Sequence, residues 1–192
     1  MYRIGFIGAQ DTGKTTIAKE LSSRFRARDV LTDYVEECAR TYISRWGAPV
    51  STMADQLFVI DKQIEREAYI SPKCELMFTD SPLTLGYVYA ILSFGSPITT
   101  KDRDILLHIY DKILNYGRYD FLLYLRSFRS PTPDGIRSAE LISKNDQIDL
   151  MIRSFLDLHK LTYTEVPGST IEARINWADS TLQRFLKEKQ VK

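Results

Sequence analysis

Short apolar runs alternate along the chain with longer stretches of helical periodicity. The apolar runs predict five strands, at Arg3–Ile7, Val30–Asp33, Leu76–Thr79, Phe121–Leu125 and Tyr163–Val166. Helical stretches separate them, and this order is typical of a parallel sheet covered by helices on both faces. We therefore predict an α/β fold with a sheet of about five parallel strands.

The helical stretches carry their own start signals and apolar faces. Four starts have the capping-box spacing of a Ser or Thr with an acid three residues later: Thr52 with Asp55, Thr99 with Asp102, Ser143 with Asp146, and Ser169 with Glu172. Two apolar stripes with helical spacing follow near the end of the chain: Ile148, Met151, Ile152, Phe155 and Leu158, then Ile171, Ile175, Ala178, Leu182 and Phe185. This periodicity predicts that both stripes pack into the core.

Length and composition indicate a single globular domain over residues 1–192. The chain has 192 residues, of which 44% are hydrophobic, enough for a core. Lys and Arg total 26 against 25 Asp and Glu, and the formal net charge of +1 does not favour nucleic acid as a partner. No apolar stretch approaches the roughly 18 residues of a membrane span, and no signal-peptide pattern is present. We expect a cytoplasmic protein, or one in the host cytoplasm if viral, without a membrane partner; its oligomeric state is left open.

Residues 8–15, with the sequence GAQDTGKT, have the pattern of a phosphate-binding loop. Two glycines separated by four residues precede a Lys and a Thr, after an apolar strand and before a helical stretch over Thr15–Arg28. Glycines let the backbone bring its N–H groups onto phosphate oxygens at a helix N-terminus. The residues predicted to bind ATP here are Gly8, Ala9, Gln10, Asp11, Thr12, Gly13, Lys14, Thr15 and Thr16.

Three of these residues have predicted roles of their own. We expect Lys14 to reach the β- and γ-phosphates, Thr15 to bind Mg²⁺ and Thr16 to contact the α-phosphate. A second magnesium ligand is predicted at Asp80, which ends the apolar run 76–79, because ligands lie outside the carboxyl ends of strands in open α/β sheets. The alternative for Asp80 is an N-cap of the helix that opens at Pro82; the two roles are compatible.

A cluster of acids follows the second predicted strand, in the segment DYVEECAR at residues 33–40. Transfer of a phosphoryl group to a hydroxyl requires a carboxylate to orient or accept the proton, and ribose hydroxyls require acceptors. The predicted substrate-binding residues are Asp33, Tyr34, Glu36, Glu37, Arg40 and the stacking aromatic Trp46. The alternative for the acids is that they only interact favourably with the dipole of the helix that follows. The alternative for Trp46 is that it is an ordinary core or rim residue.

Residues 127–140 form a candidate lid after the fourth predicted strand. Its first part, SFRSPTPDG, is dense in Ser, Pro, Asp and Gly, as in a mobile surface loop. Arg126, Arg129 and Arg137 lie in or beside it, and arginines on a closing loop would cover phosphate charge and exclude water. The alternative is a solvated basic loop.

A small kinase is the class that these features favour. The chain lacks the Asn-Lys-x-Asp tetrapeptide that reads guanine, and it is too short for the helical lid domain of a ring ATPase. The motifs GAQDTGKTT, YVEECAR with Glu37 and Arg40, FTDSP, and YDFLLYLRS followed by PDGIRS resemble the ribosylnicotinamide kinase domain of the NadR family and related small AAA-type P-loop ATPases. The resemblance implies a doubly wound P-loop core of the nucleoside and nucleotide kinase type, ATP with Mg²⁺ as donor and a nucleoside-like acceptor.

The leading hypothesis is transfer of the γ-phosphoryl group of ATP to nicotinamide riboside or a similar nucleoside. It makes Lys14, Glu37, Asp80 and Arg137 the catalytic residues, with Asp33 and Asp80 as alternatives to Glu37 as base. Two other functions stay open: a kinase acting on a nucleotide or on a hydroxyl of modified DNA, and an ATP-binding switch or ATPase. The acids and the arginines favour a kinase, because a switch does not require them.

Overall fold

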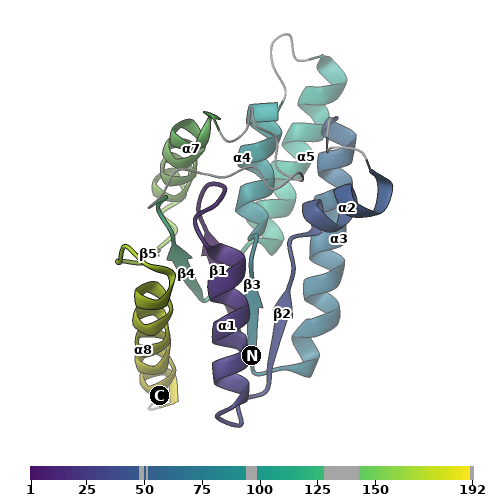
Figure 1. The fold of residues 1–192 in the computed structure, drawn as a ribbon. Helices are drawn as coiled ribbons and strands as arrows, with labels where there is room; N and C mark the ends of the chain where they lie inside the picture. Colours follow the sequence, from purple (N-terminus) through teal and green to yellow (C-terminus); the bar gives the residue numbers. More distant parts are fainter. Residues whose placement is uncertain (48–49, 51, 94–98, 128–142, 191–192) are drawn as a thin grey trace.

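The structure, a computed structural model, describes residues 1–47, 50, 52–93, 99–127 and 143–190. Within these residues, five strands form one sheet: β1 (Tyr2–Ile7), β2 (Thr32–Val35), β3 (Leu76–Thr79), β4 (Phe121–Tyr124) and β5 (Thr164–Glu165). Their order is β2-β3-β1-β4-β5, and every neighbouring pair is parallel (Figure 1). This confirms the predicted α/β fold with a sheet of five parallel strands.

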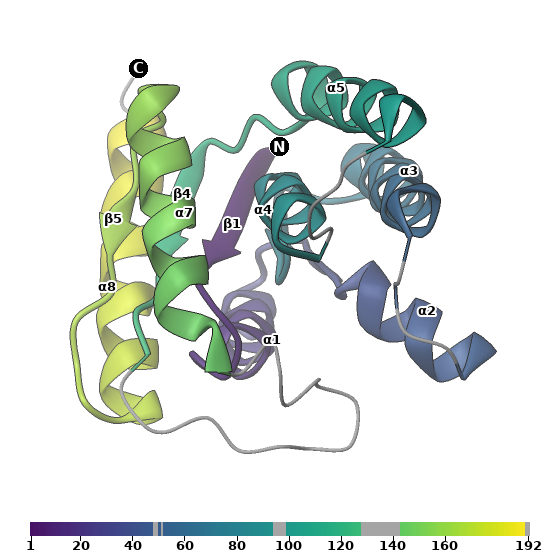
Figure 2. The same cartoon turned by 90° about the horizontal axis from the view of Figure 1, so that it is seen from above.

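Helices cover both faces of this sheet. They are α1 (Lys14–Arg26), α2 (Cys38–Trp46), α3 (Met53–Ile70), α4 (Leu83–Ser93), α5 (Thr100–Tyr116), α7 (Asn145–Leu158) and α8 (Ile171–Gln190), with a 3₁₀ turn, η1 (Ser71–Lys73). On one face, α1 and α8 pack against Ile4, Phe6 and Phe78. On the other, α4 and α7 pack against Ile7 and Tyr124. Figure 2 shows α3, α4 and α5 side by side on this second face, with α2 beyond α3.

Strand β2 lies two residues later than predicted. The predicted strand was Val30–Asp33, but the ladder with β3 begins where Thr32 pairs with Leu76. The N–H of Val30 instead donates to the carbonyl of Phe25, 3.2 Å away, which holds it in the turn after α1. Apolar content alone does not reveal this register, because it depends on the hydrogen bonds available from β3. Asp33 consequently lies within the strand rather than at its end.

Two of the four predicted capping boxes are present. Thr52 and Asp55 cap α3 reciprocally, as Thr99 and Asp102 cap α5. The other two predictions were wrong. Helix α7 begins after Lys144 without a side-chain cap, and the Oγ1 of Thr170, not Ser169, accepts the N–H of Ala173, 3.2 Å away, at the start of α8.

The predicted apolar stripes pack into the core except at one position. Leu158 is 77% exposed because it is the last residue of α7. Leu156, which the predicted stripe did not include, is the buried leucine at this end of the helix.

The helix after the phosphate-binding loop ends at Arg26 rather than at Arg28. Within the described residues, the helices are too short or too polar to cross a bilayer.

Candidate functional site

The loop between β1 and α1 has the backbone conformation of a phosphate-binding loop. Gly8 and Ala9 are buried where β1 ends, and Thr12 is fully buried, with its hydroxyl donating to the carbonyl of Ala9 at 3.2 Å. Gly13 has φ 90°, a left-handed conformation that a glycine adopts without strain. The loop thus turns directly into the N-terminus of α1, where N–H groups without intrahelical partners favour an anion.

Lys14 reaches back over this loop. Its Nζ donates to the carbonyl oxygens of Gly8, at 2.9 Å, and Ala9, at 2.6 Å. An ammonium group held there is placed to compensate the charge of a phosphate bound by the loop amides. Gln10, Asp11, Gly13, Thr15 and the exposed Thr16 line the same pocket as Lys14.

A buried arginine that the sequence did not single out holds the loop from the α8 side. Arg174 is 3% exposed, and its Nη1 donates to the carbonyls of Thr12, at 3.1 Å, and Arg126, at 2.9 Å. Its Nε donates to the carbonyl of Gly168 at 2.9 Å. Burial lowers the pKa of the guanidinium, which the charge of Glu165 opposes. One side chain therefore joins the phosphate-binding loop, the end of β4 and the loop before α8.

Asp80 follows β3 and lies beside the start of α1. It is 1% exposed, and its Oδ2 accepts hydrogen bonds from the hydroxyls of Thr15, at 2.6 Å, and Tyr34, at 3.0 Å. Burial and the charge of Asp80 raise the pKa of Tyr34, so this phenol stays a donor. The predicted capping role for Asp80 is not seen: the N–H of Leu83 donates to the hydroxyl of Tyr119, 3.1 Å away.

The side chains of Thr15 and Asp80 fit a magnesium ion. The Oδ1 atom of Asp80 is buried without a hydrogen-bond donor from the described residues, and the Thr15 hydroxyl lies against the other carboxylate oxygen. Magnesium prefers oxygen ligands and is often held by one or two carboxylates together with substrate phosphates. Within the described residues no group of three or more His, Cys, Asp and Glu side chains gathers into a metal cluster. An ion here would therefore use Thr15, Asp80 and the phosphates.

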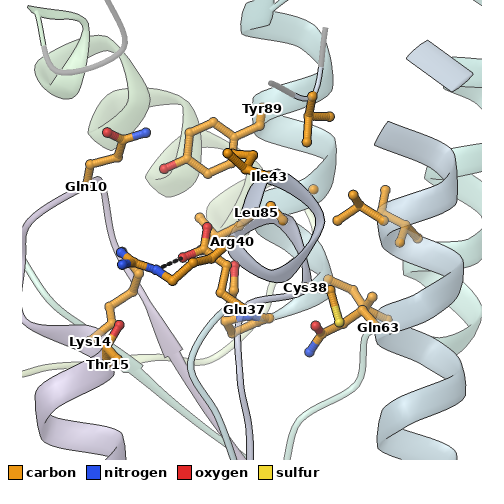
Figure 3. Close-up of a pocket in the computed structure, with 18 of the residues that line it drawn as sticks. Gln10, Lys14, Thr15, Glu37, Cys38, Arg40, Ile43, Gln63, Leu85 and Tyr89 are labelled. Atoms are coloured by element: carbon orange, nitrogen blue, oxygen red, sulfur yellow. Dashed lines mark ion pairs between the residues drawn. The ribbon is translucent and has the colours of Figure 1, made fainter. Parts of the chain in front are cut away.

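A cavity of about 330 Å³ opens from the phosphate-binding loop and continues between α2, α3 and α4. Glu37, the residue before α2, lies on its wall, and a carboxylate oxygen of Glu37 is 4.0 Å from the Nε of Arg40 (Figure 3). Both side chains are about 30% exposed. The remaining walls are largely apolar and include Ile43, Val59, Ile60, Leu85 and Tyr89. The cavity thus joins an anion site, an acid and an apolar compartment.

Three of the other predicted substrate residues, Asp33, Tyr34 and Glu36, are not brought to this cavity. Glu36 faces Lys19, with 3.5 Å between Oε1 and Nζ, and lies outside the lining. Asp33 and Tyr34 point to opposite faces of the sheet, because neighbouring strand residues alternate. Tyr34 points to Asp80 and the loop, so Asp33 lies on the other face; its carboxylate accepts the N–H of Tyr34 at 2.7 Å. On that face, burial, and after it the charge of Asp33, raises the pKa of the Cys74 thiol.

The predicted lid falls almost entirely outside the described residues, and with it Arg129 and Arg137. Arg126 is described: it is exposed, and its Nη1 lies 3.8 Å from the carboxylate of Glu165. Trp46 ends α2, and the position of its side chain is likewise outside the description.

Two cavity residues on α3 were not predicted from the sequence. Gln56 and Gln63 are 5% and 4% exposed and line the cavity next to apolar neighbours. They are seven residues apart, and Glu67 follows four residues later, also buried at 3% exposure. Polar residues that repeat along the buried face of a helix are unusual, and that spacing is the signal that could have found them.

Comparison with known proteins places this geometry in a family. Residues 3–174 match the family described as AAA domain. The chain belongs to this AAA domain family. No curated protein sequence matched it.

Solved structures share the fold of this AAA domain. NadR protein in complex with NAD and AMP-PNP has a TM-score of 0.72 at 17% identity, and NadR protein in complex with NR has 0.73 at 20%. Each match covers 95% of this chain but 49% or 50% of the NadR chain, so the AAA domain spans about half of that length. Deoxyadenosine kinase from M. mycoides, with dCMP and dCDP bound, has a TM-score of 0.68 at 14% sequence identity. This match covers 95% of this chain and 99% of the kinase chain. The fold is that of P-loop nucleoside kinases, as the resemblance implied.

Proposed function

We propose that this AAA domain is a kinase that transfers the γ-phosphoryl group of ATP to a hydroxyl of a nucleoside-like acceptor. The observation that carries the proposal is a single cavity whose walls hold both the phosphate-binding loop and Glu37. A volume of about 330 Å³ lies within the range of small-molecule sites. An ATPase switch does not require a second, largely apolar compartment with a carboxylate beside the phosphates.

The donor side uses the loop and its supports. The loop amides and Lys14 bind the β- and γ-phosphates, and Arg126, Arg129 and Arg137 are proposed to close over them. Thr15 and Asp80 would hold Mg²⁺, which would neutralise charge on the phosphates. Tyr34 holds the Asp80 carboxylate in place through its 3.0 Å hydrogen bond.

The acceptor side uses Glu37 as the base. The acceptor hydroxyl oxygen forms the new bond to the γ-phosphorus while the bond from that phosphorus to the bridging oxygen of ADP breaks. The hydroxyl proton passes to the Glu37 carboxylate, and Arg40 orients that carboxylate from one turn along α2. Asp33 is not retained as an alternative base, because it lies outside the cavity lining.

The proposed acceptor is a nucleoside, with nicotinamide riboside as the leading candidate. The apolar walls at Val59, Leu85 and Tyr89 suit a planar ring, and the Glu37–Arg40 pair suits ribose hydroxyls. The NadR resemblance of the motifs supports nicotinamide riboside within that class. The near-neutral charge of the chain argues against a polyanionic acceptor such as DNA.

The test is transfer of labelled γ-phosphate from ATP, with and without Mg²⁺, to a panel of acceptors. The panel holds nicotinamide riboside, common nucleosides, mononucleotides, and single- and double-stranded DNA with modified bases. Lys14→Ala should abolish transfer, and Lys62→Ala, an exposed lysine on α3 paired with Glu65, serves as the matched control. Label in a free nucleoside supports the proposal. Label only in nucleotides or DNA, or ATP hydrolysis without transfer to any acceptor, contradicts it.

A further inference from the structure

Glu67 on α3 accepts hydrogen bonds at both of its carboxylate oxygens. It is 3% exposed, and Oε2 forms an ion pair with the guanidinium of Arg3 from β1. Its Oε1 accepts from the hydroxyl of Tyr119, at 3.0 Å, and from the Nε2 of Gln63, at 2.9 Å. The buried charge is thus compensated by Arg3 and surrounded by donors, which makes this carboxylate a fixed acceptor.

This arrangement decides which way the amide of Gln63 faces. An amide has a donating NH₂ and an accepting oxygen, whereas an ionised carboxylate only accepts. The NH₂ of Gln63 must therefore face Glu67, one helical turn along α3 from it. The Oε1 atom of Gln63 is left at the other end of the planar amide, away from Glu67. Gln63 lines the cavity, and Figure 3 shows its amide pointing from α3 toward Cys38.

The Oε1 atom of Gln63 accepts no hydrogen bond from the described residues. The hydrogen bond of Gln63 within the described chain runs from its NH₂ to Glu67. Around the amide, the neighbouring cavity residues Val59 and Ile60 are apolar. This oxygen is not one of the fully buried side-chain atoms without a partner, so it stays accessible on the cavity side of Gln63. A ring that covers it removes its water, so a bound molecule with an N–H group at this wall gains a hydrogen bond that an analogue without one loses.

We propose that Gln63 is a specificity-determining residue that selects acceptors whose ring carries an N–H donor, such as a carboxamide or an exocyclic amino group. The inference rests on the proposed nucleoside kinase function and narrows its substrate class. Glu67 is a positioning residue in this scheme, since it acts only by fixing the amide of Gln63. The apolar neighbours of Gln63 suit the ring of the acceptor, while Glu37 and Arg40 serve its ribose hydroxyls.

The experiment compares acceptors that differ only at the donor. One pair is nicotinamide riboside and nicotinic acid riboside; the other is adenosine and purine riboside, which lacks the amino group. For whichever pair is phosphorylated, kcat/KM should favour the member with the N–H donor by roughly ten- to hundred-fold. Gln63→Met, which keeps the side-chain length without the amide, should bring that ratio close to one.

Two further variants separate selection from a general loss of packing. Gln56→Met removes the other buried amide on the cavity face of α3 and should lower kcat/KM for both members of a pair by the same factor. Glu67→Gln keeps the size of the side chain but lets Gln63 turn over, so it should reduce the preference while leaving KM for ATP unchanged. A role for Glu67 in folding alone would move the melting temperature and not this ratio.

The outcomes distinguish this inference from the function on which it rests. If no nucleoside is phosphorylated, the proposed function fails and the inference with it. If nucleosides are phosphorylated but the ratio within a pair is near one, or is unchanged by Gln63→Met, the kinase function stands and the role of Gln63 is refuted. An equal loss for both members in Gln63→Met would likewise refute it, because that result indicates a contact with the ribose.

Discussion

The hydroxyl of Thr15 donates to Oδ2 of Asp80 across 2.6 Å, although 65 positions separate the two residues. The parallel pairing of β1 with β3 makes this contact, since Gly5 lies opposite Thr79 and both strands end at the same edge of the sheet. The contact places a hydroxyl and a carboxylate, the two predicted magnesium ligands, at the first turn of α1. The sheet register, rather than a local motif, thus brings together the two side chains proposed to hold Mg²⁺.

We expect Asp80→Asn to lower kcat by at least about 100-fold, because the amide keeps the shape of the side chain but removes the charge proposed to hold Mg²⁺. The measurement is kcat as a function of magnesium concentration. Tyr34→Phe is the matched control, since it removes one hydrogen bond to the same oxygen and should cost less than about tenfold. An unchanged magnesium dependence in Asp80→Asn would show that this carboxylate does not bind the ion.

Glu37→Gln should reduce turnover far more than ATP affinity. Loss of a general base typically costs about 10²- to 10⁴-fold in rate, whereas the phosphates bind to the loop and to Lys14. The measurements are kcat for phosphoryl transfer and the dissociation constant of ATP from a binding titration. Equal losses in both would contradict the role of Glu37 as base and indicate a contact with the donor instead.

The phosphate-binding loop and Asp80 could be predicted from the sequence, whereas the walls of the candidate site could not. The loop at residues 8–15 and the position of Asp80 follow from short motifs next to apolar strands, and both lie where those motifs predict. The cavity wall on α3 could not be placed in the same way, because Gln63 faces the site only through the packing of α3 against α2 and α4. The strand shift that removes Asp33 from the site depends on the hydrogen-bond register between β2 and β3.

Arg174→Met should raise KM for ATP by roughly three- to tenfold, because it removes three hydrogen bonds that hold the phosphate-binding loop and the loop at Gly168. KM for the acceptor should change little, since Arg174 is not part of the cavity lining. Steady-state kinetics with each substrate varied in turn checks this split. Equal rises in both KM values would mean that Arg174 supports the whole fold rather than the donor side.

The ion pair between Arg28 and Asp179 should make stability depend on pH. Two contacts of 2.6 Å join the turn after α1 to α8, and the hydrogen bond from Arg28 lowers the pKa of the Asp179 carboxyl. The pair therefore stabilises the fold above the unfolded carboxyl pKa of about 3.9, and this contribution is lost as the pH falls toward the lower folded value. Asp179→Asn should cost about 1 kcal/mol near neutral pH, since Arg28 is 42% exposed.

Urea unfolding of wild type and Asp179→Asn at pH 7, 5, 4 and 3 checks this sign. The difference in unfolding free energy should shrink as the pH falls through the acidic range. A difference that stays constant down to pH 3 would show that the ion pair contributes through packing rather than through charge.

Gly86 lets α4 approach α3 closely at the cavity wall where the acceptor is proposed to bind. A Cβ at this position would lie 2.7 Å from Cγ1 and 2.8 Å from Cδ1 of Ile60, both too close for undisturbed contact. Gly86→Ala should therefore force Ile60 to shift within the cavity wall and raise KM for the acceptor by roughly three- to tenfold, with ATP binding unchanged. Adding Ile60→Ala removes both clashing atoms and should restore acceptor binding in the double variant. A double-mutant cycle on acceptor KM measures this coupling, and strictly additive effects would show that the two residues do not act through this contact.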